Sequence, residues 1–194
     1  MKLVTIQHKK VLYSLIKGNT YINDFKYVLT NSDDDSETIT DEERLDISKV
    51  KSYQVLMRHY KYTTPPIFCC VVDRVANFTR TTPSKDNVLL ELDVPDDFIH
   101  LHPFDTWDYI YRRINRNRWN EDLYEEEKVY LDGKDTDGTV LCSIQAVIPC
   151  IKPEWLKFAY KIDDKFIDLC TENYIFEAGY SSNPLIYLNE EFKK

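Results

Sequence analysis

With 194 residues the chain is long enough for one domain, and hydrophobic residues make up 43% of it, which excludes an intrinsically disordered protein. No apolar stretch approaches the roughly 18 residues of a membrane-spanning helix. Acidic residues outnumber basic ones by 33 to 25, and the net charge of −8 disfavours non-specific binding to nucleic acids and to anionic membranes.

The cysteines indicate a reducing compartment. Their number is odd, no Cys-x-x-Cys pair occurs, and Cys69 and Cys70 are neighbours in one apolar run. The first residues, Met1 to Gln7, contain no signal-peptide h-region. We therefore expect a cytoplasmic protein in which Cys69, Cys70 and Cys142 pack in the core instead of acting as nucleophiles.

The N-terminal part of the chain predicts a strand, a helix and a second strand. Lys2 to Gln7 alternates apolar and polar residues, and His8 to Lys17 has the spacing of an amphipathic helix. Gly18 stands where a residue in the left-handed conformation would end that helix. The aromatic and β-branched run from Tyr21 to Leu29 predicts the second strand, and the acidic run 31–40 predicts a loop.

The middle of the chain predicts a helix followed by strands. Thr40 begins a capping box, and the helix that follows must end before Pro65. The apolar run from Ile67 to Val72 is typical of a central strand. Val88 to Val94 alternates as a strand with one apolar face, and Phe98 to Leu101 is a candidate for a further short strand.

The remaining part predicts two helices and one more strand. Asp105 is in position to cap a helix whose apolar stripe includes Trp107, and Leu123 to Leu131 is acidic and predicts a second helix. Val140 to Ile148 alternates as a strand. Residues 159–194 show weak periodicity, and we expect them to form an extension packed on the same domain.

These elements predict an α+β fold in a single domain spanning residues 1–194. Strands and helices follow one another without the regular spacing of βαβ units. This favours a mixed or antiparallel sheet with three to four helices over a doubly wound parallel sheet. The sequence contains no internal repeat and no evident linker between domains.

Four residues are candidates for binding a ligand. Gln7 and Gln145 lie on strands that are otherwise apolar, and a buried amide needs partners from the backbone or from a ligand. Asp105 and Trp107 stand together at a helix N-terminus, a place that favours anions and nucleotides. The competing interpretation is a helix cap for Asp105 and core packing for Trp107, and it is the stronger one.

A group of arginines follows Asp105 and Trp107 in the sequence. Arg112, Arg113 and Arg116, with Arg118 close behind, lie on and just after the predicted helix and are candidates for binding a phosphate or a carboxylate partner. The alternative is a solvated helix face whose charge is neutralised by the acidic residues 125–127.

The segment His100-x-His102 would place two imidazoles on the same side of an extended chain, with Asp96 and Asp97 as nearby oxygen ligands. A metal-dependent hydrolase is the function that such a pair would support. Ordinary polar residues before Pro103 are the favoured interpretation, so no metal site is expected. The sequence lacks a phosphate-binding glycine loop, a His-Glu-x-x-His motif and a Gly-x-Ser-x-Gly motif.

Several segments together resemble a known family. They are Thr5-Ile6-Gln7, the run from Leu89 to Asp97, Phe104-Asp105-Thr106-Trp107 and Ile144-Gln145-Ala146. In these segments, which span roughly Met1 to Phe158, the chain resembles a set of uncharacterised bacterial and phage proteins, the domain of unknown function family 3841. The most specific of them is Leu-Glu-Leu-Asp-Val-Pro-Asp-Asp, and the resemblance implies no reaction.

More distantly, the order of elements is similar to that of small ADP-ribosyltransferase toxins. This similarity implies an NAD-binding cleft lined by Gln7, Trp107 and Gln145. The toxins carry a catalytic Glu on a later strand, near a Gln-x-Glu pattern, whereas Val147 stands at that position here. The similarity therefore implies a relative that binds a nucleotide without transferring ADP-ribose.

The sequence is compatible with three functions. The first is a small cytoplasmic protein, related to phages or mobile elements, that binds a partner protein and needs no cofactor, since Tyr and Trp are good interface anchors. The second is an ADP-ribosyltransferase-like enzyme, or a degenerate relative, with NAD as its cofactor. The third is the metal-dependent hydrolase. No motif in the sequence assigns an enzymatic reaction.

Overall fold

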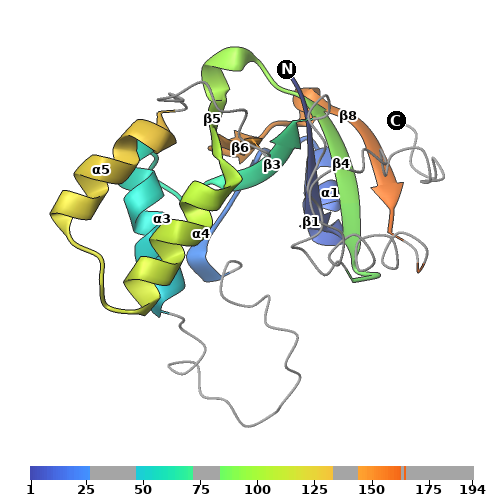
Figure 1. Cartoon of the computed structure of the whole chain (residues 1–194). Helices are drawn as coiled ribbons and strands as arrows, with labels where there is room; N and C mark the ends of the chain where they lie inside the picture. Colours follow the sequence, from blue (N-terminus) through green and yellow to red (C-terminus); the bar gives the residue numbers. More distant parts are fainter. Residues whose placement is uncertain (27–46, 72–83, 133–143, 163, 165–194) are drawn as a thin grey trace, which may run out of the picture.

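The computed structural model describes residues 1–26, 47–71, 84–132, 144–162 and 164 (Figure 1). In these ranges an antiparallel sheet lies between helix α1 (Lys9–Ile16) on one face and three helices on the other. The three helices are α3 (Ile47–Tyr60), α4 (Phe104–Asn115) and α5 (Glu121–Leu131). The predicted fold class, a single-domain α+β protein, is confirmed. None of the helices in these ranges combines the length and apolarity that crossing a membrane requires.

The sheet has six strands. In spatial order they are β5 (His100–Pro103), β6 (Ile144–Ile148), β3 (Ile67–Val71), β1 (Lys2–His8), β4 (Asn87–Asp93) and β8 (Leu156–Lys161). Every neighbouring pair is antiparallel. A separate two-stranded ribbon joins β2 (Tyr21–Ile22) to β7 (Cys150–Ile151).

The register of the strands decides which side chains share a face, because paired residues point to the same side of a sheet. Leu3 pairs with Val71 and with Leu92, and all three belong to the apolar cluster under α1. We call this side the α1 face. Phe68 pairs with Val147, and both pack beneath α3, α4 and α5. We call this side the helical face.

Helix α1 has defined caps at both ends, and the cap at Gly18 is the one that the sequence predicts. The His8 side chain accepts a hydrogen bond from a backbone N–H of the first turn (3.1 Å). Gly18, with φ of 83°, donates its N–H to the Leu15 carbonyl (2.9 Å), and Asn19 donates to the Ser14 carbonyl (3.1 Å). These two bonds form a Schellman motif, which requires the left-handed conformation that glycine adopts easily.

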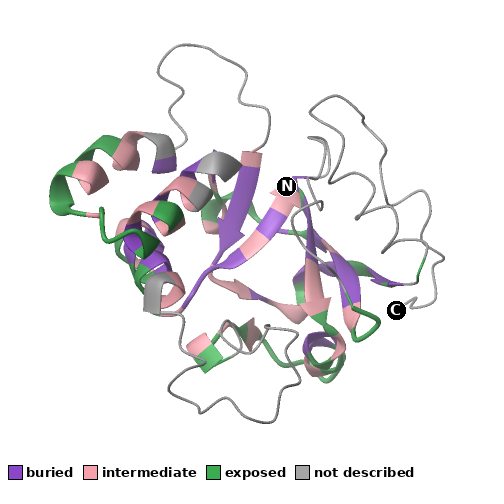
Figure 2. Cartoon of the chain, turned by 60° about the horizontal axis from the view of Figure 1, so that its bottom comes forward, coloured by how far each residue is buried: buried purple, intermediate pink, exposed green. Residues whose placement is uncertain are grey.

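Burial is concentrated in the sheet and on the inward sides of the helices (Figure 2). On the helical face the fully buried side chains include Leu56 of α3, Ile110 of α4 and Leu131 of α5, which meet Val147 of β6. Burying a Leu or Ile side chain contributes roughly 1.5–3 kcal/mol. These contacts are therefore the main attachment of the three helices to the sheet.

The strand predicted for Tyr21 to Leu29 is wrong in its length. Within its described part, residues 21–26, only Tyr21 and Ile22 are paired, as β2, and the backbone is already helical at Phe25 and Lys26; residues 27–29 lie outside the described residues. The cause is Asp24, whose Oδ1 accepts a hydrogen bond from the Lys26 N–H (3.0 Å) in the manner of a helix cap.

Two boundaries near residue 100 also differ from the prediction. Strand β5 begins at His100 because residues 96–98 form a 3-10 turn. Helix α4 begins at Phe104, and the residue before it is Pro103, whose ring fixes φ at a value suited to that position. Asp105 therefore lies in the first turn and is not the N-cap.

The sequence does not predict β8, and the last three residues of this strand fall in the segment predicted as an extension. Leu92 pairs with Leu156 whereas Glu91 pairs with Phe158, which leaves Lys157 as an extra residue. This bulge shifts the following side chains by one position and so removes the alternation by which a strand is recognised.

Some predictions lie outside the described residues. They are the acidic loop 31–40, the capping box at Thr40, the first four residues of the strand predicted for 140–148, and the C-terminal segment from residue 165.

Candidate functional site

The predicted cleft between the two glutamines does not form, because they lie on opposite faces of the sheet. Gln7 pairs with Val88, which belongs to the apolar cluster under α1. Gln145 is two positions from Val147 on β6 and therefore shares the helical face. The prediction of a single cleft lined by Gln7, Trp107 and Gln145 is therefore wrong. The strand register decides which face each glutamine shares, and the sequence pattern does not specify that register.

The amide of Gln7 is used within the sheet. Its Nε2 donates to Thr5 Oγ1 (2.9 Å), and the Thr5 hydroxyl donates to the carbonyl of Phe68 (2.8 Å). These bonds link β1 to β3 through side chains in addition to the backbone ladder. They agree with a structural role for Gln7.

Trp107 packs among aromatic rings on the helical face. The centre of its ring lies 5.0 Å from that of Tyr53 and 5.2 Å from that of Phe68. These distances are typical of core aromatic pairs and agree with the packing interpretation. Asp105 lies two residues before Trp107 in the first turn of α4, and its side chain lies outside the described part of the structure.

Three histidines from two segments that are distant in sequence, α3 and β5, come together around Tyr60. His100 stacks on the Tyr60 ring with 4.6 Å between centroids and 20° between planes, and His59 meets its edge at 4.8 Å. The His102 ring lies nearly parallel to it at 6.1 Å. We call these four residues the histidine–tyrosine cluster. The sequence singles out His100 and His102, but the two residues from α3 join them only through the fold.

His102 is the most buried member of the cluster, with 1% of its surface exposed. Its Nδ1 lies 2.8 Å from the hydroxyl of Tyr60, and its Nε2 lies 3.3 Å from Oε1 of Gln145. The Tyr60 hydroxyl also donates to the carbonyl of Leu131 (3.0 Å). Burial lowers the pKa of His102 to about 4, although the bond to Gln145 acts in the opposite direction. The ring is therefore neutral at pH 7.

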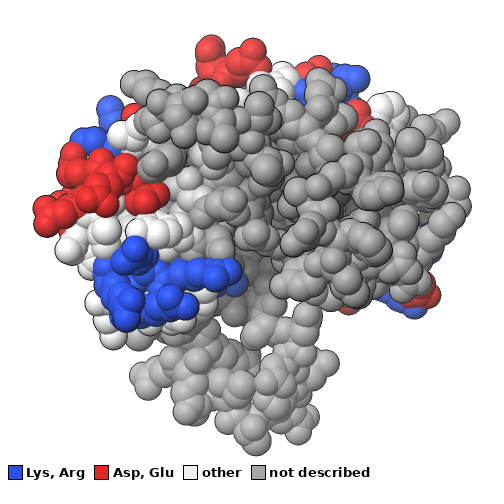
Figure 3. All heavy atoms as spheres, viewed as in Figure 1, with Lys and Arg blue, Asp and Glu red and all other residues white. Residues whose placement is uncertain are grey.

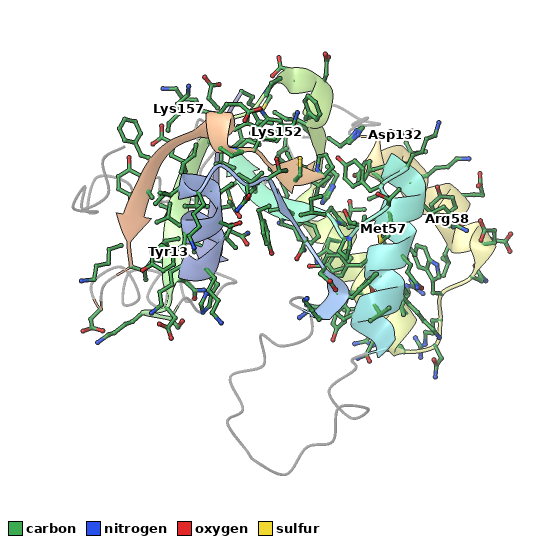
Figure 4. All side chains as sticks on the ribbon, turned by 180° about the vertical axis from the view of Figure 1, so that it is seen from behind. Tyr13, Met57, Arg58, Asp132, Lys152 and Lys157 are labelled. Carbon is green, nitrogen blue, oxygen red and sulfur yellow. The ribbon has the colours of Figure 1, made fainter. Side chains whose placement is uncertain are left out.

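His59 connects the cluster to the end of α5. Its Nε2 lies 3.0 Å from Asp132 Oδ1, and its Nδ1 lies 3.3 Å from the hydroxyl of Tyr124. Burial lowers the pKa of His59, and Asp132 opposes this shift. The guanidinium of Arg58 lies 4.0 Å from the centre of the Tyr124 ring. Figure 4 shows Arg58 and Asp132 at the end of the molecule where α3 and α5 lie together.

The geometry gives little support to a metal site at His100 and His102. Both ring nitrogens of His102 already face protein groups at hydrogen-bond distance. Among the residues that the structure describes, no three His, Cys, Asp or Glu side chains are grouped so as to hold a metal ion. Asp96 and Asp97 are exposed in the turn before β5.

The thiols of β3 are in the sheet. Cys69 is buried, and burial raises the pKa of Cys70 to about 12. A thiol with such a pKa stays protonated at neutral pH, so it is not an activated nucleophile. Cys142 lies outside the described residues.

The predicted arginines lie at the C-terminal end of α4. Arg112 and Arg113 are in its last turn and Arg116 is the C-cap, where positive charge is favoured by the carbonyl end of the helix. Asn117 follows in the left-handed conformation with φ of 53°, and the N–H of Arg118 bonds to the carbonyl of Arg113 (2.8 Å). This second Schellman motif fixes the path of the chain that carries the arginines.

Opposite charges lie side by side on two helices. Figure 3 shows basic side chains over the end of α4 next to acidic side chains over α5. The exposed acids of α5 are Glu121, Asp122, Glu125 and Glu126. Several of the charged groups have local contacts. Arg58 of α3 lies 3.2 Å from Glu121, Lys128 pairs with Glu125 within α5, and the Arg113 guanidinium lies 4.8 Å from the centre of the Tyr109 ring.

The model of the family described as Domain of unknown function (DUF3841) matches residues 2–154, which is most of the chain. The chain belongs to this family. No curated protein and no solved structure matches it. In this DUF3841 protein the match runs from β1 to β7, so it includes both the histidine–tyrosine cluster and the arginines of α4, whereas β8 follows it.

The similarity to ADP-ribosyltransferase toxins remains a prediction. Val147, at the position where those toxins carry their Glu, is inaccessible beneath the helices. A nucleotide could reach it only if the helical layer moved away from the sheet.

Proposed function

We propose that this DUF3841 protein acts by binding a partner protein, without a cofactor, through a charged surface that we call the α4–α5 surface. It consists of Arg112, Arg116 and Arg118 at the end of α4 together with the exposed acids of α5. The observation that carries the proposal is the separation of opposite charges onto two neighbouring helices (Figure 3). A partner with the reverse arrangement of charges would bind in a single orientation.

The arginine side of this surface suits the recognition of carboxylates. A guanidinium can bind a carboxylate through two parallel hydrogen bonds, and arginine is enriched in protein interfaces. The chain between the helices is ordered before binding, because α4 ends in a Schellman motif and Asn120 Oδ1 accepts a hydrogen bond from the Leu123 N–H (2.9 Å) at the start of α5. A preordered surface loses less conformational freedom when it binds.

A protein suits this surface better than a nucleic acid. The chain carries a net charge of −8, so the protein as a whole repels a phosphate backbone. The acids of α5 stand beside the arginines and would repel the phosphates locally as well. The catalytic alternatives have less support, because an NAD cleft needs Gln7 and Gln145 on one face and a hydrolase needs histidine nitrogens that are free to bind a metal.

The test is a charge reversal at two exposed positions. The variant Arg116→Glu/Arg118→Glu reverses the basic half of the surface. The matched control is Lys10→Glu/Lys17→Glu on α1, which changes the net charge equally and, like Arg116→Glu, reverses a charge at a helix C-cap. Each protein is immobilised and exposed to lysate of the source organism at low salt and at high salt.

We expect the wild-type protein and the Lys10/Lys17 control to retain the same partner at low salt, and the Arg116/Arg118 variant to lose it. High salt should release the partner, because exposed charges are screened within about 10 Å at 0.1 M salt. If both variants retain the partner equally, or if retention does not depend on salt, the α4–α5 surface is not the binding site.

A further inference from the structure

One face of α5 is neutralised by charges of the same molecule. Glu121 lies 3.2 Å from the guanidinium of Arg58 on α3, and Glu125 pairs with Lys128 three residues further along the helix. Residues three and four apart lie on the same side of a helix, so the two acids and the lysine share one face. The acids of this face therefore have their partners within the molecule.

The neighbouring face of α5 carries two acids that have no such partner. Asp122 and Glu126 are both exposed, and no ion pair within the described residues involves either of them. Like charges four residues apart repel each other and weaken a helix. The positive end of the helix explains the acid at Asp122, but Glu126 lies in the middle of α5. Cations from outside the molecule would relieve this repulsion.

The end of α4 carries the opposite charge in the same situation. Arg116 is the C-cap of the helix and Arg118 lies two residues beyond it, and both side chains are exposed. Neither belongs to an ion pair in the part of the chain that the structure describes. The carbonyl end of α4 explains a cation at Arg116, but this effect does not extend past the last turn to Arg118.

These two groups of charges are complementary to each other under a twofold rotation. They lie side by side at the surface, with uncharged side chains between them (Figure 3). If a twofold axis runs in the interface along the boundary between the groups, the acids of each copy face the arginines of the other. The reverse arrangement of charges that the α4–α5 surface requires of a partner is thus present on a second copy of the chain.

The chain between the two charged groups supplies a centre for such an interface. Trp119 stands between Arg118 and the start of α5, and its ring is half-buried against the helical-face core. Residues near the axis of a twofold dimer meet their own copies. Tryptophan at the centre of a surface with a polar rim is typical of the residues that contribute most to binding.

We infer that the α4–α5 surface binds a second copy of this chain across a twofold axis, so that Arg116 and Arg118 of each protomer meet Asp122 and Glu126 of the other. The inference rests on the binding role proposed for this surface and names its occupant. The net charge of −8 opposes association at long range. At about 0.1 M salt, however, exposed charges more than about 10 Å apart are largely screened, whereas groups in contact still attract.

The first measurement is the self-association of the purified wild-type chain. Sedimentation velocity is recorded over a wide range of protein concentration at about 0.1 M and at about 1 M salt, where screening extends to contacting groups. We expect monomers to convert to dimers with rising concentration at the lower salt, and the higher salt to shift the equilibrium back to monomers.

A charge exchange tests the pairing itself. Arg116→Glu/Arg118→Glu makes both halves of the surface acidic, and Asp122→Lys/Glu126→Lys makes both halves basic. Each substitution acts twice in a twofold dimer, so we expect either variant alone to dimerise about a hundredfold more weakly than the wild type. An equimolar mixture of the two variants should form a heterodimer, because every contact between them again joins opposite charges.

The matched control is Lys10→Glu/Lys17→Glu on α1, which has the same net charge as the Arg116/Arg118 variant. It should dimerise like the wild type. Mixed with the Asp122/Glu126 variant it should form only its own homodimer, because its arginines would face the added lysines. Circular dichroism checks that each variant is folded. If Asp122→Lys/Glu126→Lys does not fold, Glu126→Lys alone, at an exposed position in the middle of α5, replaces it.

Three results would overturn the inference. They are a wild-type chain that stays monomeric at every concentration, a dimer that neither charge variant weakens, and a mixture of the two variants without heterodimers. The proposed function fails separately. If the purified chain is monomeric but the lysate experiment retains a different protein that the Arg116/Arg118 variant loses, the surface binds a partner other than a second copy.

Discussion

On the α1 face, Leu3, Leu90 and Leu92 pack with valine, alanine and cysteine side chains, whereas the helical face is filled with aromatic rings and hydrogen-bonded polar groups. Of the five buried polar residues in the described part of the chain, four lie in α3, α4, β5 and β6: Ser52, His102, Thr106 and Gln145. Apolar contacts are non-directional, but buried polar groups need particular partners in a particular geometry. One sheet thus carries a face that is held by apolar contacts and a face whose packing also depends on buried hydrogen bonds.

The largest loss of stability is expected from a cavity in the apolar core of the α1 face. Leu90→Ala removes a side chain with no exposed surface and leaves a cavity between the sheet and α1, so the free energy of unfolding should fall by about 2–5 kcal/mol in urea titrations. The control Ile16→Ala changes a residue that is 59% exposed and should cost less than about 0.5 kcal/mol. Equal losses in the two variants would show that the α1 face is not a close-packed core.

A smaller effect separates the polar face from the apolar one. Tyr60→Phe keeps the ring but removes the hydroxyl that joins His102 to Leu131, which leaves two buried groups without their partner. We expect a loss of about 1–3 kcal/mol in the free energy of unfolding.

The control for that variant is Tyr62→Phe, because the Tyr62 hydroxyl makes one long hydrogen bond within the described residues, to the carbonyl of Val147 (3.4 Å). It should cost about 1 kcal/mol or less. If Tyr62→Phe is as destabilising as Tyr60→Phe, the hydrogen bonds of the Tyr60 hydroxyl to His102 and Leu131 have no special part in holding the helical face.

The smallest loss of stability is expected from a change in backbone conformation at Gly18, at the C-terminal end of α1. An added Cβ at Gly18 meets no atom within 4 Å, so Gly18→Ala changes only the cost of the left-handed conformation. We expect a loss of about 1 kcal/mol in thermal or urea unfolding, and a smaller loss for Gly18→Asn, since asparagine tolerates this conformation. No loss in Gly18→Ala would mean that the Schellman motif does not stabilise the helix.

Local patterns predicted the elements whose causes are local. The cap at Gly18 and the alternation of Val88 to Val94 depend on neighbouring residues, and both are present in the structure. The length of β2 and the existence of β8 were missed because a single side chain, Asp24, and a single inserted residue, Lys157, override the pattern around them.

The candidate site could be predicted only in part. The spacing of His100 and His102 indicated that they share one side of a strand, and β5 has them so. Their partners Tyr60 and Gln145 come from α3 and β6, and nothing in the local sequence specifies that β6 lies between β5 and β3. The same missing strand order led to the prediction that the two glutamines share a cleft.

The bulge in β8 has a consequence for how copies of the protein meet. β8 is the outermost strand of the described sheet on one side, and an outermost strand can recruit a strand from another molecule. The inserted Lys157 distorts its hydrogen-bonding edge, and both Lys157 and Lys161 are exposed there. A kinked edge that carries two lysines disfavours edge-to-edge aggregation, so the irregularity that hides this strand from sequence patterns also protects the sheet.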